Sequence, residues 1–159
     1  MKKILYGILW ILFIMYAAVM LWLLFGQRMD REFVGTYLQQ LRCNLIPFET
    51  IWRFAKIIVT GYPDDVIPHA WQNLIGNVVM FMPIGACLPC FFERCRRLRT
   101  IFPIGLLIVA GIEFTQFFSL LGSLDFDDFM LNMIGICLGY AVWRFCFEKL
   151  PKICINKKD

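Results

Sequence analysis

The chain has 159 residues, of which 60% are hydrophobic and only 18% are charged, and its mean hydropathy is +0.66. A soluble domain of this length leaves a large part of its surface in water, so it cannot bury this much apolar side chain. The formal net charge of +4 is modest. These values exclude an ordinary soluble domain and indicate a membrane protein.

The first apolar segment, residues 4–25, follows two lysines and is uninterrupted. As a helix rising about 1.5 Å per residue, it is long enough to cross the hydrocarbon core of a bilayer. A signal peptide would have a shorter apolar core and a small-residue cleavage site, and neither is present. The segment therefore predicts a retained transmembrane helix.

The next segment, residues 26–70, mixes polar and apolar residues, and none of its apolar stretches is long enough to cross. Residues 33–41 are weakly amphipathic, and residues 51–60 are apolar but carry Arg53 and Lys56. This pattern is typical of a segment that lies in the membrane interface with its cations directed to the headgroups.

Three further spans are predicted at residues 71–92, 101–121 and 129–147. The cationic loop 93–100 separates the second span from the third, and an acidic loop separates the third from the fourth. We therefore expect an all-α polytopic membrane protein with a single domain over residues 1–159. Its architecture would be a four-helix transmembrane bundle with an interfacial amphipathic segment between the first and second spans.

The distribution of charge predicts the orientation of this bundle. With four spans, the N-terminal lysines, the 93–100 loop and the tail 149–158 share one side, and all three are cationic. On the opposite side, bases and acids are balanced or acids predominate. Short cytoplasmic loops collect Lys and Arg, so we predict a multi-pass plasma-membrane protein with both termini in the cytoplasm. Because topology explains the cationic loop, nucleic acid is not an expected partner.

The seven cysteines lie mostly inside or beside apolar segments. An extracellular disulfide framework would place an even number of them in polar loops. Cys87, Cys90 and Cys95 have redox or metal spacing, but no second pair completes a zinc site. We interpret Cys87, Cys137 and Cys146 as small buried hydrophobic residues and expect neither a metal nor a cofactor.

Polar side chains inside or next to the spans form a candidate ligand-binding cluster. Ionisable and amide side chains are costly in a membrane and are usually functional. They lie beside or in the outer halves of the predicted spans, so they share one depth, that of the outer leaflet. The members of this predicted cluster are Arg42, Asn44, Asn73, Asn77, Glu113, Gln116, Asp125, Asp128 and Asn132.

A purely structural interpretation stays open for several members of the cluster. Asn and Gln often serve only to join helices, through hydrogen bonds worth about 0.6 kcal/mol on average. Asp125 and Asp128 lie where N-terminal capping residues of the fourth span are expected. Glu113 is harder to explain in this way, because a carboxylate at this depth needs a partner or a proton. Arg42 is the candidate partner.

Two glycines of the fourth span are predicted to have a packing role. Gly135 and Gly139 continue the helical stripe that begins with Asp128 and Asn132. They form a small-xxx-small motif, which allows a neighbouring helix to approach closely.

Several motifs run in order through about two thirds of the chain, and together they resemble the VanZ-like family of bacterial membrane proteins. They are Arg42-Cys43-Asn44-Leu45-Ile46-Pro47-Phe48, Asn73-x-x-Gly76-Asn77, Phe81-x-Pro83-x-Gly85 with Pro89, Glu113-x-x-Gln116, and Asp125-x-x-Asp128-x-x-x-Asn132-x-x-Gly135-x-x-x-Gly139-Tyr140. Relatives commonly carry an Arg after the Gly that precedes the Asp pair, whereas this chain has Gly122-Ser123. A role that depends on that cation would fall to Arg42.

The resemblance implies a link to glycopeptide antibiotics, because the founding member of the family is associated with teicoplanin resistance. Glycopeptides act on the outer face, where lipid-linked cell-wall precursors are displayed. We expect a protein that binds or modulates a lipid-linked envelope component or a lipoglycopeptide at the outer leaflet, among membrane lipids. Arg42 would meet phosphate or carboxylate, Asn77, Gln116 and Asn132 would supply neutral hydrogen bonds, and Glu113 and Asp128 would orient the network.

Two other functions stay open. An intramembrane enzyme acting on a polar or isoprenoid lipid could use Glu113, Asp125 and Asp128 for metal or acid–base chemistry. The sequence offers no His-rich metal motif and no Ser or Cys beside a base to support it. A small lipid transporter would also use intramembrane carboxylates, but units of four spans would need to oligomerise to form a pathway. The sequence does not specify the oligomeric state.

Overall fold

The computed structural model describes residues 2–26, 43–119 and 122–147 of the chain. Four of its helical segments are long and apolar enough to cross a membrane: Ile4–Gly26, Asp64–Phe91, Leu98–Phe118 and Phe126–Cys146. They are built from α1 (Lys2–Leu21) with η1 (Trp22–Gly26), η2 (Asp64–Val66) with α5 (Ile67–Phe91), α6 (Leu98–Phe118), and α7 (Phe126–Val142) with η4 (Trp143–Phe147). The predicted all-α membrane bundle is confirmed.

The second, third and fourth spans all begin earlier than the apolar pattern predicts; α6, for example, begins at Leu98 and not at residue 101. The second was expected from residue 71, but α5 begins at Ile67. Pro68 suits the first turn of α5, because a backbone N–H in that turn would have no acceptor within the helix and proline has none to leave unpaired. The fourth was expected from residue 129, but α7 begins at Phe126, directly after Asp125, which caps it. Acidic residues in a first turn favour a helix through its dipole, so the boundary follows local chemistry and not hydropathy.

The short elements lie between the spans. The interfacial segment contains α4 (Glu49–Thr60), an amphipathic helix with Thr50 and Phe54 buried, while residues 33–41 lie outside the described part of the chain. A pair of two-residue strands, β1 (Cys43–Asn44) and β2 (Leu124–Asp125), aligns in parallel. This pair was not predicted from the sequence. The predicted cationic loop contains the 3₁₀ helix η3 (Glu93–Arg96).

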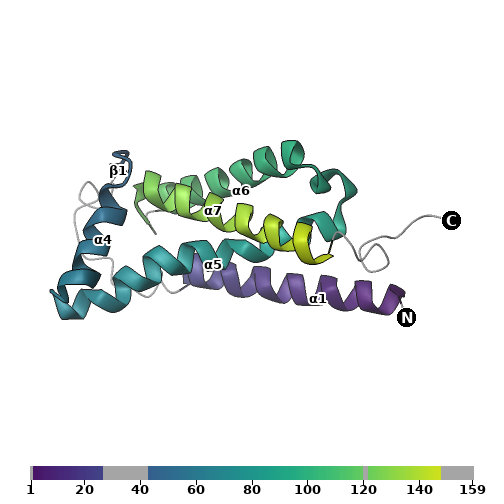
Figure 1. The fold of residues 1–159 in the computed structure, drawn as a ribbon, viewed down its shortest axis with the longest axis horizontal. Coiled ribbons are helices and arrows are strands. Elements are labelled where there is room, and N and C mark those ends of the chain that lie inside the picture. The colour runs from purple at the N-terminus through teal and green to yellow at the C-terminus, as the bar shows by residue number, and fades with distance from the viewer. Residues whose placement is uncertain (1, 27–42, 120–121, 148–159) are drawn as a thin grey trace.

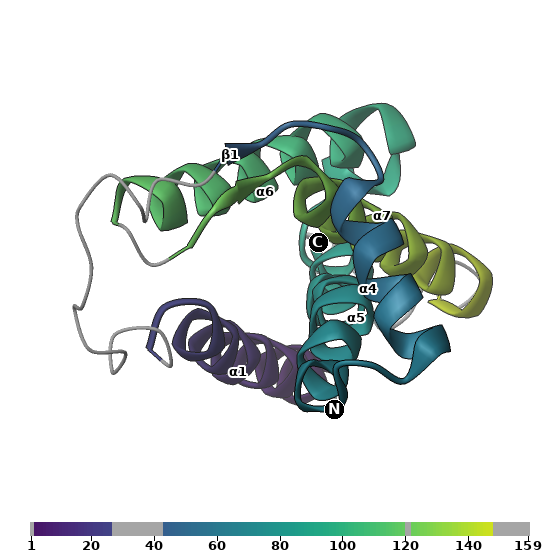
Figure 2. The same cartoon turned by 90° about the vertical axis from the view of Figure 1, so that its left-hand side faces the viewer.

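The long helices run side by side, and the short elements lie at opposite ends of the bundle (Figure 1). At one end, α4 crosses α5 and α7, as the end-on view in Figure 2 shows. We call this the α4 end. At the other end lie η3, the start of α1 and the end of η4 (Figure 1), and we call this the η3 end. Helix α5 is central, because it contacts α1, α4, α6 and α7.

The most extensive helix contact joins α5 and α7, and glycines make it possible. A Cβ atom built on Gly139 would lie 1.9 Å from the carbonyl oxygen of Met82, and one built on Gly135 would lie 2.3 Å from that of Val78. From the other side, a Cβ on Gly85 would lie 2.0 Å from the carbonyl oxygen of Ile136. The two backbones therefore touch where no side chain fits, which is the packing that the motif of the fourth span predicts.

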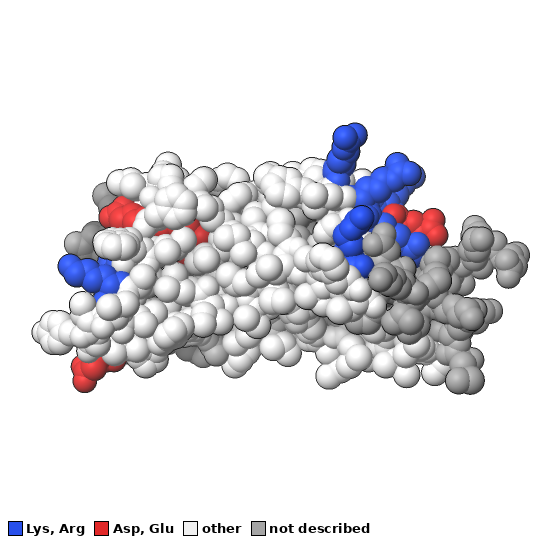
Figure 3. Space-filling view, in the orientation of Figure 1, with Lys and Arg blue, Asp and Glu red and all other residues white. Residues whose placement is uncertain are grey.

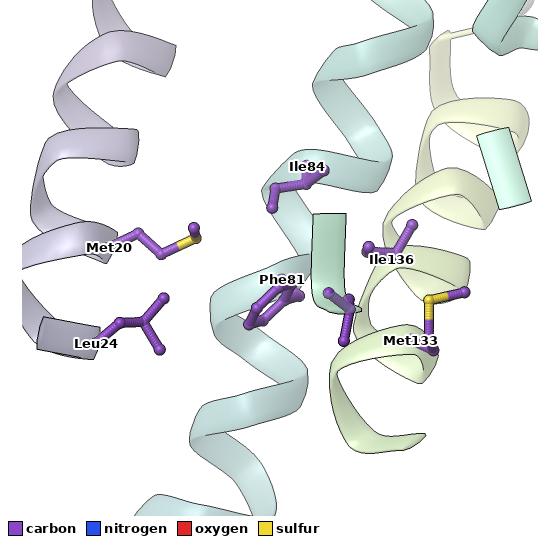
Figure 4. Packing of buried hydrophobic residues seen from close by; sticks show 7 residues of the cluster. Met20, Leu24, Phe81, Ile84, Met133 and Ile136 are labelled. Carbon is purple, nitrogen blue, oxygen red and sulfur yellow. The ribbon is translucent and has the colours of Figure 1, made fainter. Parts of the chain in front are cut away.

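An apolar cluster links the first span to this pair. Met20 and Leu24 reach from α1 and η1 toward α5, where Phe81 and Ile84 meet them (Figure 4). Val109, Met133 and Ile136 complete the cluster from α6 and α7. Since lipid tails are as apolar as these side chains, the cluster holds the bundle by close packing and not by removing apolar surface from water.

The η3 end is fixed to the bundle by hydrogen bonds. The Tyr140 hydroxyl donates to the Arg96 carbonyl oxygen at 2.8 Å, and the Arg96 Nε donates to the Pro89 carbonyl oxygen at 3.2 Å. Cys95 is buried beside Ile101 and Tyr140. Burial disfavours the thiolate and raises the pKa of the Cys95 thiol.

Replacing Gly139 with Ala is expected to destabilise the protein by about 1–3 kcal/mol or more, because a methyl group must displace the backbone of α5. Gly111→Ala, on an exposed face of α6 with nothing within 4 Å, is the matched control and is expected to be neutral or slightly stabilising. Thermal unfolding in detergent measures both. Equal unfolding temperatures would contradict the close α5–α7 contact.

Cys95 is expected to react with a maleimide at least about tenfold more slowly than the exposed Cys43 at neutral pH, because it is buried and its thiolate is disfavoured. The rate should rise with pH as the thiolate forms. Quantitative labelling of single-cysteine variants in detergent measures the two rates. A Cys95 rate equal to that of Cys43 would show that η3 is not packed on the bundle.

Candidate functional site

Hydrogen bonds sort the described members of the predicted cluster into three groups, all toward the α4 end. The first, the α4 tether, consists of Asn44, Thr50, Asp125 and Asp127. The second, the Asp128 group, consists of Asn73, Asn77 and Asp128. The third, the Glu113 group, consists of Glu113, Gln116 and Asn132. Arg42 lies outside the described residues.

In the α4 tether, the Asp125 carboxylate joins two helices. One oxygen accepts from the backbone N–H of Asp127 at 2.9 Å and so caps α7. The other accepts from the Thr50 hydroxyl of α4 at 2.6 Å, and Thr50 in turn accepts from the Asn44 amide at 2.9 Å. The capping role that the sequence left open for Asp125 is therefore present, together with a contact across the chain.

Asp127 caps α4 from a different helix. Phe48 occupies the N-cap position of α4, where Ser, Thr, Asp or Asn usually accepts from the first N–H groups, and its phenyl ring cannot accept. Asp127 supplies the missing acceptors: Oδ1 binds the Phe48 N–H at 2.6 Å and Oδ2 binds the Ile51 N–H at 3.0 Å. Asp127 is fully buried. Its carboxylate fixes α4 across the end of the bundle.

In the Asp128 group, two amides from α5 meet one carboxylate oxygen from α7. The side-chain nitrogens of Asn73 and Asn77 donate to Asp128 Oδ1 at 2.9 and 2.8 Å. The two asparagines are four residues apart, so they lie one above the other on one face of α5. Asp128 is partly exposed. It therefore joins α5 to α7, while Asp125 occupies the N-cap position of α7.

The Glu113 group lies about one turn deeper along α7 and is almost fully buried. The Asn132 amide donates to Glu113 Oε1 at 3.0 Å and joins α7 to α6. Glu113, Gln116 and Asn132 expose only 4%, 4% and 2% of their surfaces, so their polar atoms depend on protein partners. The Gln116 amide donates at 3.2 Å to the Leu24 carbonyl oxygen in η1. This bond ties α6 to the end of the first span.

Two amide oxygens of these groups have no hydrogen-bond partner among the described residues. They are Oδ1 of Asn73 and Oδ1 of Asn132, and both atoms are buried. A buried acceptor without a donor costs about 1–3 kcal/mol, and such atoms in folded proteins usually have an explanation. The carboxylates attract the N–H₂ sides of both amides, which turns the two oxygens away from them. Both oxygens are therefore left without a hydrogen-bond donor among the described residues.

Metal chemistry finds no support within residues 2–26, 43–119 and 122–147, where no group of three or more His, Cys, Asp or Glu side chains is close enough to hold an ion. The carboxylates instead form hydrogen bonds to amides, a hydroxyl and backbone N–H groups. The arrangement suits recognition of a polar group by hydrogen bonds at the end of an apolar bundle.

A model of the VanZ/LLP1 family matches residues 5–147, nearly the whole chain. The chain belongs to this family. Comparisons with curated proteins and with solved structures gave no match. In this chain, the motif residues Gly85, Gly135 and Gly139 form the α5–α7 contact, and Asn73, Asn77 and Asp128 form the Asp128 group.

Sequence reasoning about this VanZ-like protein did not identify Thr50 or Asp127 as members of the cluster. Asp127 was seen only as one acid of a loop, and its partners are backbone N–H groups 76 and 79 residues away in sequence. One signal was available: α4 begins at Phe48 and Glu49 without a local side chain that caps it. Its first backbone N–H groups therefore need an acceptor from another part of the chain. Nothing in the sequence indicates which acid supplies it.

Asp127→Ala is expected to loosen α4, because two backbone N–H groups lose their acceptor, at a cost of about 1–2 kcal/mol. Hydrogen–deuterium exchange in detergent should show about tenfold faster exchange in α4 and little change in the inner turns of α5 and α7. Asp65→Ala, an exposed acid at the same end, is the matched control. Unchanged exchange in α4 of the Asp127 variant would refute the proposed capping role.

Proposed function

We propose that this VanZ-like protein binds, at the α4 end of its bundle, the polar headgroup of a lipid-linked envelope component or a lipoglycopeptide of the teicoplanin type, and thereby modulates the action of such antibiotics. The observation that carries the proposal is the concentration of hydrogen-bonding side chains from three spans beneath α4. Buried carboxylates at this depth cost free energy, and such side chains in membrane proteins usually have a function.

The state of the hydrogen bonds supports a ligand that is rich in donors. One N–H of each side-chain amide of Asn77, Gln116 and Asn132 already binds a protein acceptor. In the three groups of the α4 end, the buried atoms without a partner among the described residues are the acceptors Asn73 Oδ1 and Asn132 Oδ1. Hydroxyl and ammonium groups, such as those of a glycan or an amino sugar, complement these oxygens.

Charge supports placing the α4 end at the outer face of the plasma membrane. Arg94, Arg96, Arg97 and Arg99 lie at the η3 end, where Figure 3 shows the blue side chains gathered. Acidic side chains, including Asp125 and Asp127, belong to the α4 end. The positive-inside rule then puts the η3 end in the cytoplasm, and the ligand would approach from outside the cell.

The proposal is tested by expressing the wild type, Glu113→Gln and Asp128→Asn in a susceptible Gram-positive host and measuring inhibition by teicoplanin beside vancomycin. The wild type should reduce teicoplanin susceptibility. Each variant should lose most of this protection, because an amide in place of the carboxylate meets the N–H₂ groups of Asn132 or of Asn73 and Asn77 with half the acceptor atoms.

Asp65→Asn, an exposed acid at the α4 end, serves as the matched control and should protect like the wild type. Membrane abundance is compared by immunoblot, so that a loss of protection is read only at equal protein level. Full protection by both variants would refute the role of these groups. A well-inserted wild type that gives no protection would show that teicoplanin is not the relevant ligand of this chain.

A further inference from the structure

The η3 end carries a second polar surface that the proposed ligand site does not use. The sequence from residue 93 to residue 99 contains four Arg and one Glu. Arg96 is turned inward, where its Nε binds the Pro89 carbonyl oxygen. Arg94, Arg97 and Arg99 are exposed. Figure 3 shows the resulting blue group projecting over η3 and the start of α6.

The backbone that carries these three arginines is held in place. The N–H of Cys95 donates to the Phe92 carbonyl oxygen at 3.0 Å, and the Tyr140 hydroxyl binds the Arg96 carbonyl oxygen at 2.8 Å. The buried Cys95 packs beneath the loop. A loop that served only to carry positive charge for topology would not need such fixation. Fixed guanidinium groups lose less conformational freedom when they bind an anion.

Within the described part of the chain, no carboxylate pairs with Arg94, Arg97 or Arg99, although Glu93 is next to them in sequence. Their donors therefore face outward. Three exposed guanidinium groups lie within six residues of the chain, and each can donate two parallel hydrogen bonds to phosphate oxygens.

Apolar side chains accompany the arginines. Phe92, Leu98 and Phe102 flank or interleave with them along the chain, and each exposes about half of its surface. A soluble phosphate would make no apolar contact with these side chains, whereas a phospholipid can bind the arginines through its phosphate and the apolar side chains through its acyl chains. Basic sites between transmembrane helices at the cytoplasmic side commonly bind anionic headgroups in this way.

We propose that Arg94, Arg97 and Arg99, with Phe92, Leu98 and Phe102, form a binding site for an anionic phospholipid in the leaflet that the η3 end meets. The guanidinium groups hold the headgroup phosphate, and the apolar side chains contact the first part of the acyl chains. The site is independent of the ligand proposed for the α4 end. It ties the end of α5, η3 and the start of α6 to one lipid molecule.

The test uses the purified full chain in detergent with equal amounts of phosphatidylglycerol and phosphatidylcholine that carry the same acyl chains. Native mass spectrometry reads the ratio of the two lipids retained on the protein. The wild type should retain phosphatidylglycerol preferentially. Arg97→Gln/Arg99→Gln should reduce that preference by about 25-fold, since each arginine near an anionic headgroup contributes about fivefold.

Arg53→Gln/Lys56→Gln, which removes two exposed cations from α4, is the matched control and should keep the wild-type preference. Equal losses in the two double variants would overturn the proposal, as would a wild type without preference. The detergent assay has no membrane sidedness, so an effect of the substitutions on insertion in cells does not enter the result.

Two further arms decide between lipid and free phosphate and guard against unfolding. At constant low ionic strength, replacing chloride with inorganic phosphate should not displace phosphatidylglycerol, and complete displacement would show a phosphate site without a lipid role. Raising NaCl from about 0.05 to about 0.5 M should abolish the wild-type preference, because the Debye length falls to a few Å. A preference that resists salt would overturn the proposal even if the glutamine variant fails to fold.

Discussion

The contact between α5 and α7 is the constraint on which the rest of the structure depends. Gly85, Gly135 and Gly139 allow two backbones to meet where a single methyl group would collide with a carbonyl oxygen. Apolar side chains gain little free energy when they move from lipid tails into the protein interior, so this close packing must hold the helices together. The contact also fixes their register, and it thereby brings Asn73 and Asn77 of α5 to the same oxygen of Asp128 on α7.

At the α4 end, neighbouring acidic residues of one short segment bind different partners. Asp125 caps its own helix and binds Thr50, Asp127 caps α4 from a distance, and Asp128 receives two amides from α5. Three acids within four residues thus meet three different partners, because successive residues at the start of a helix point in different directions. Asp125 and Asp127 thereby hold α4 across the end of the bundle.

The two ends of the bundle have opposite chemistry. At the α4 end, carboxylates are satisfied by amides and backbone N–H groups, and the unpaired atoms among the described residues are acceptors. At the η3 end, a backbone fixed by Tyr140 and by the inward Arg96 presents arginines outward. A donor-rich ligand suits the first end and an anionic headgroup suits the second. The bundle between them is apolar, and its exposed side chains on α1 and α6 face the lipid.

The sequence by itself determined the class of protein, the number of spans and most of the polar residues, because a bilayer requires about 20 apolar residues for each helix and makes every polar exception conspicuous. It also determined the packing glycines, since their spacing of four residues places them on one face. Only the tertiary structure decided the partners: Asp127 with the N–H groups of α4, Gln116 with the Leu24 carbonyl, and Asn132 with Glu113. Those pairs join residues between 19 and 92 positions apart. The rotation and depth of each helix, which local patterns do not encode, decide which of several similar side chains meet.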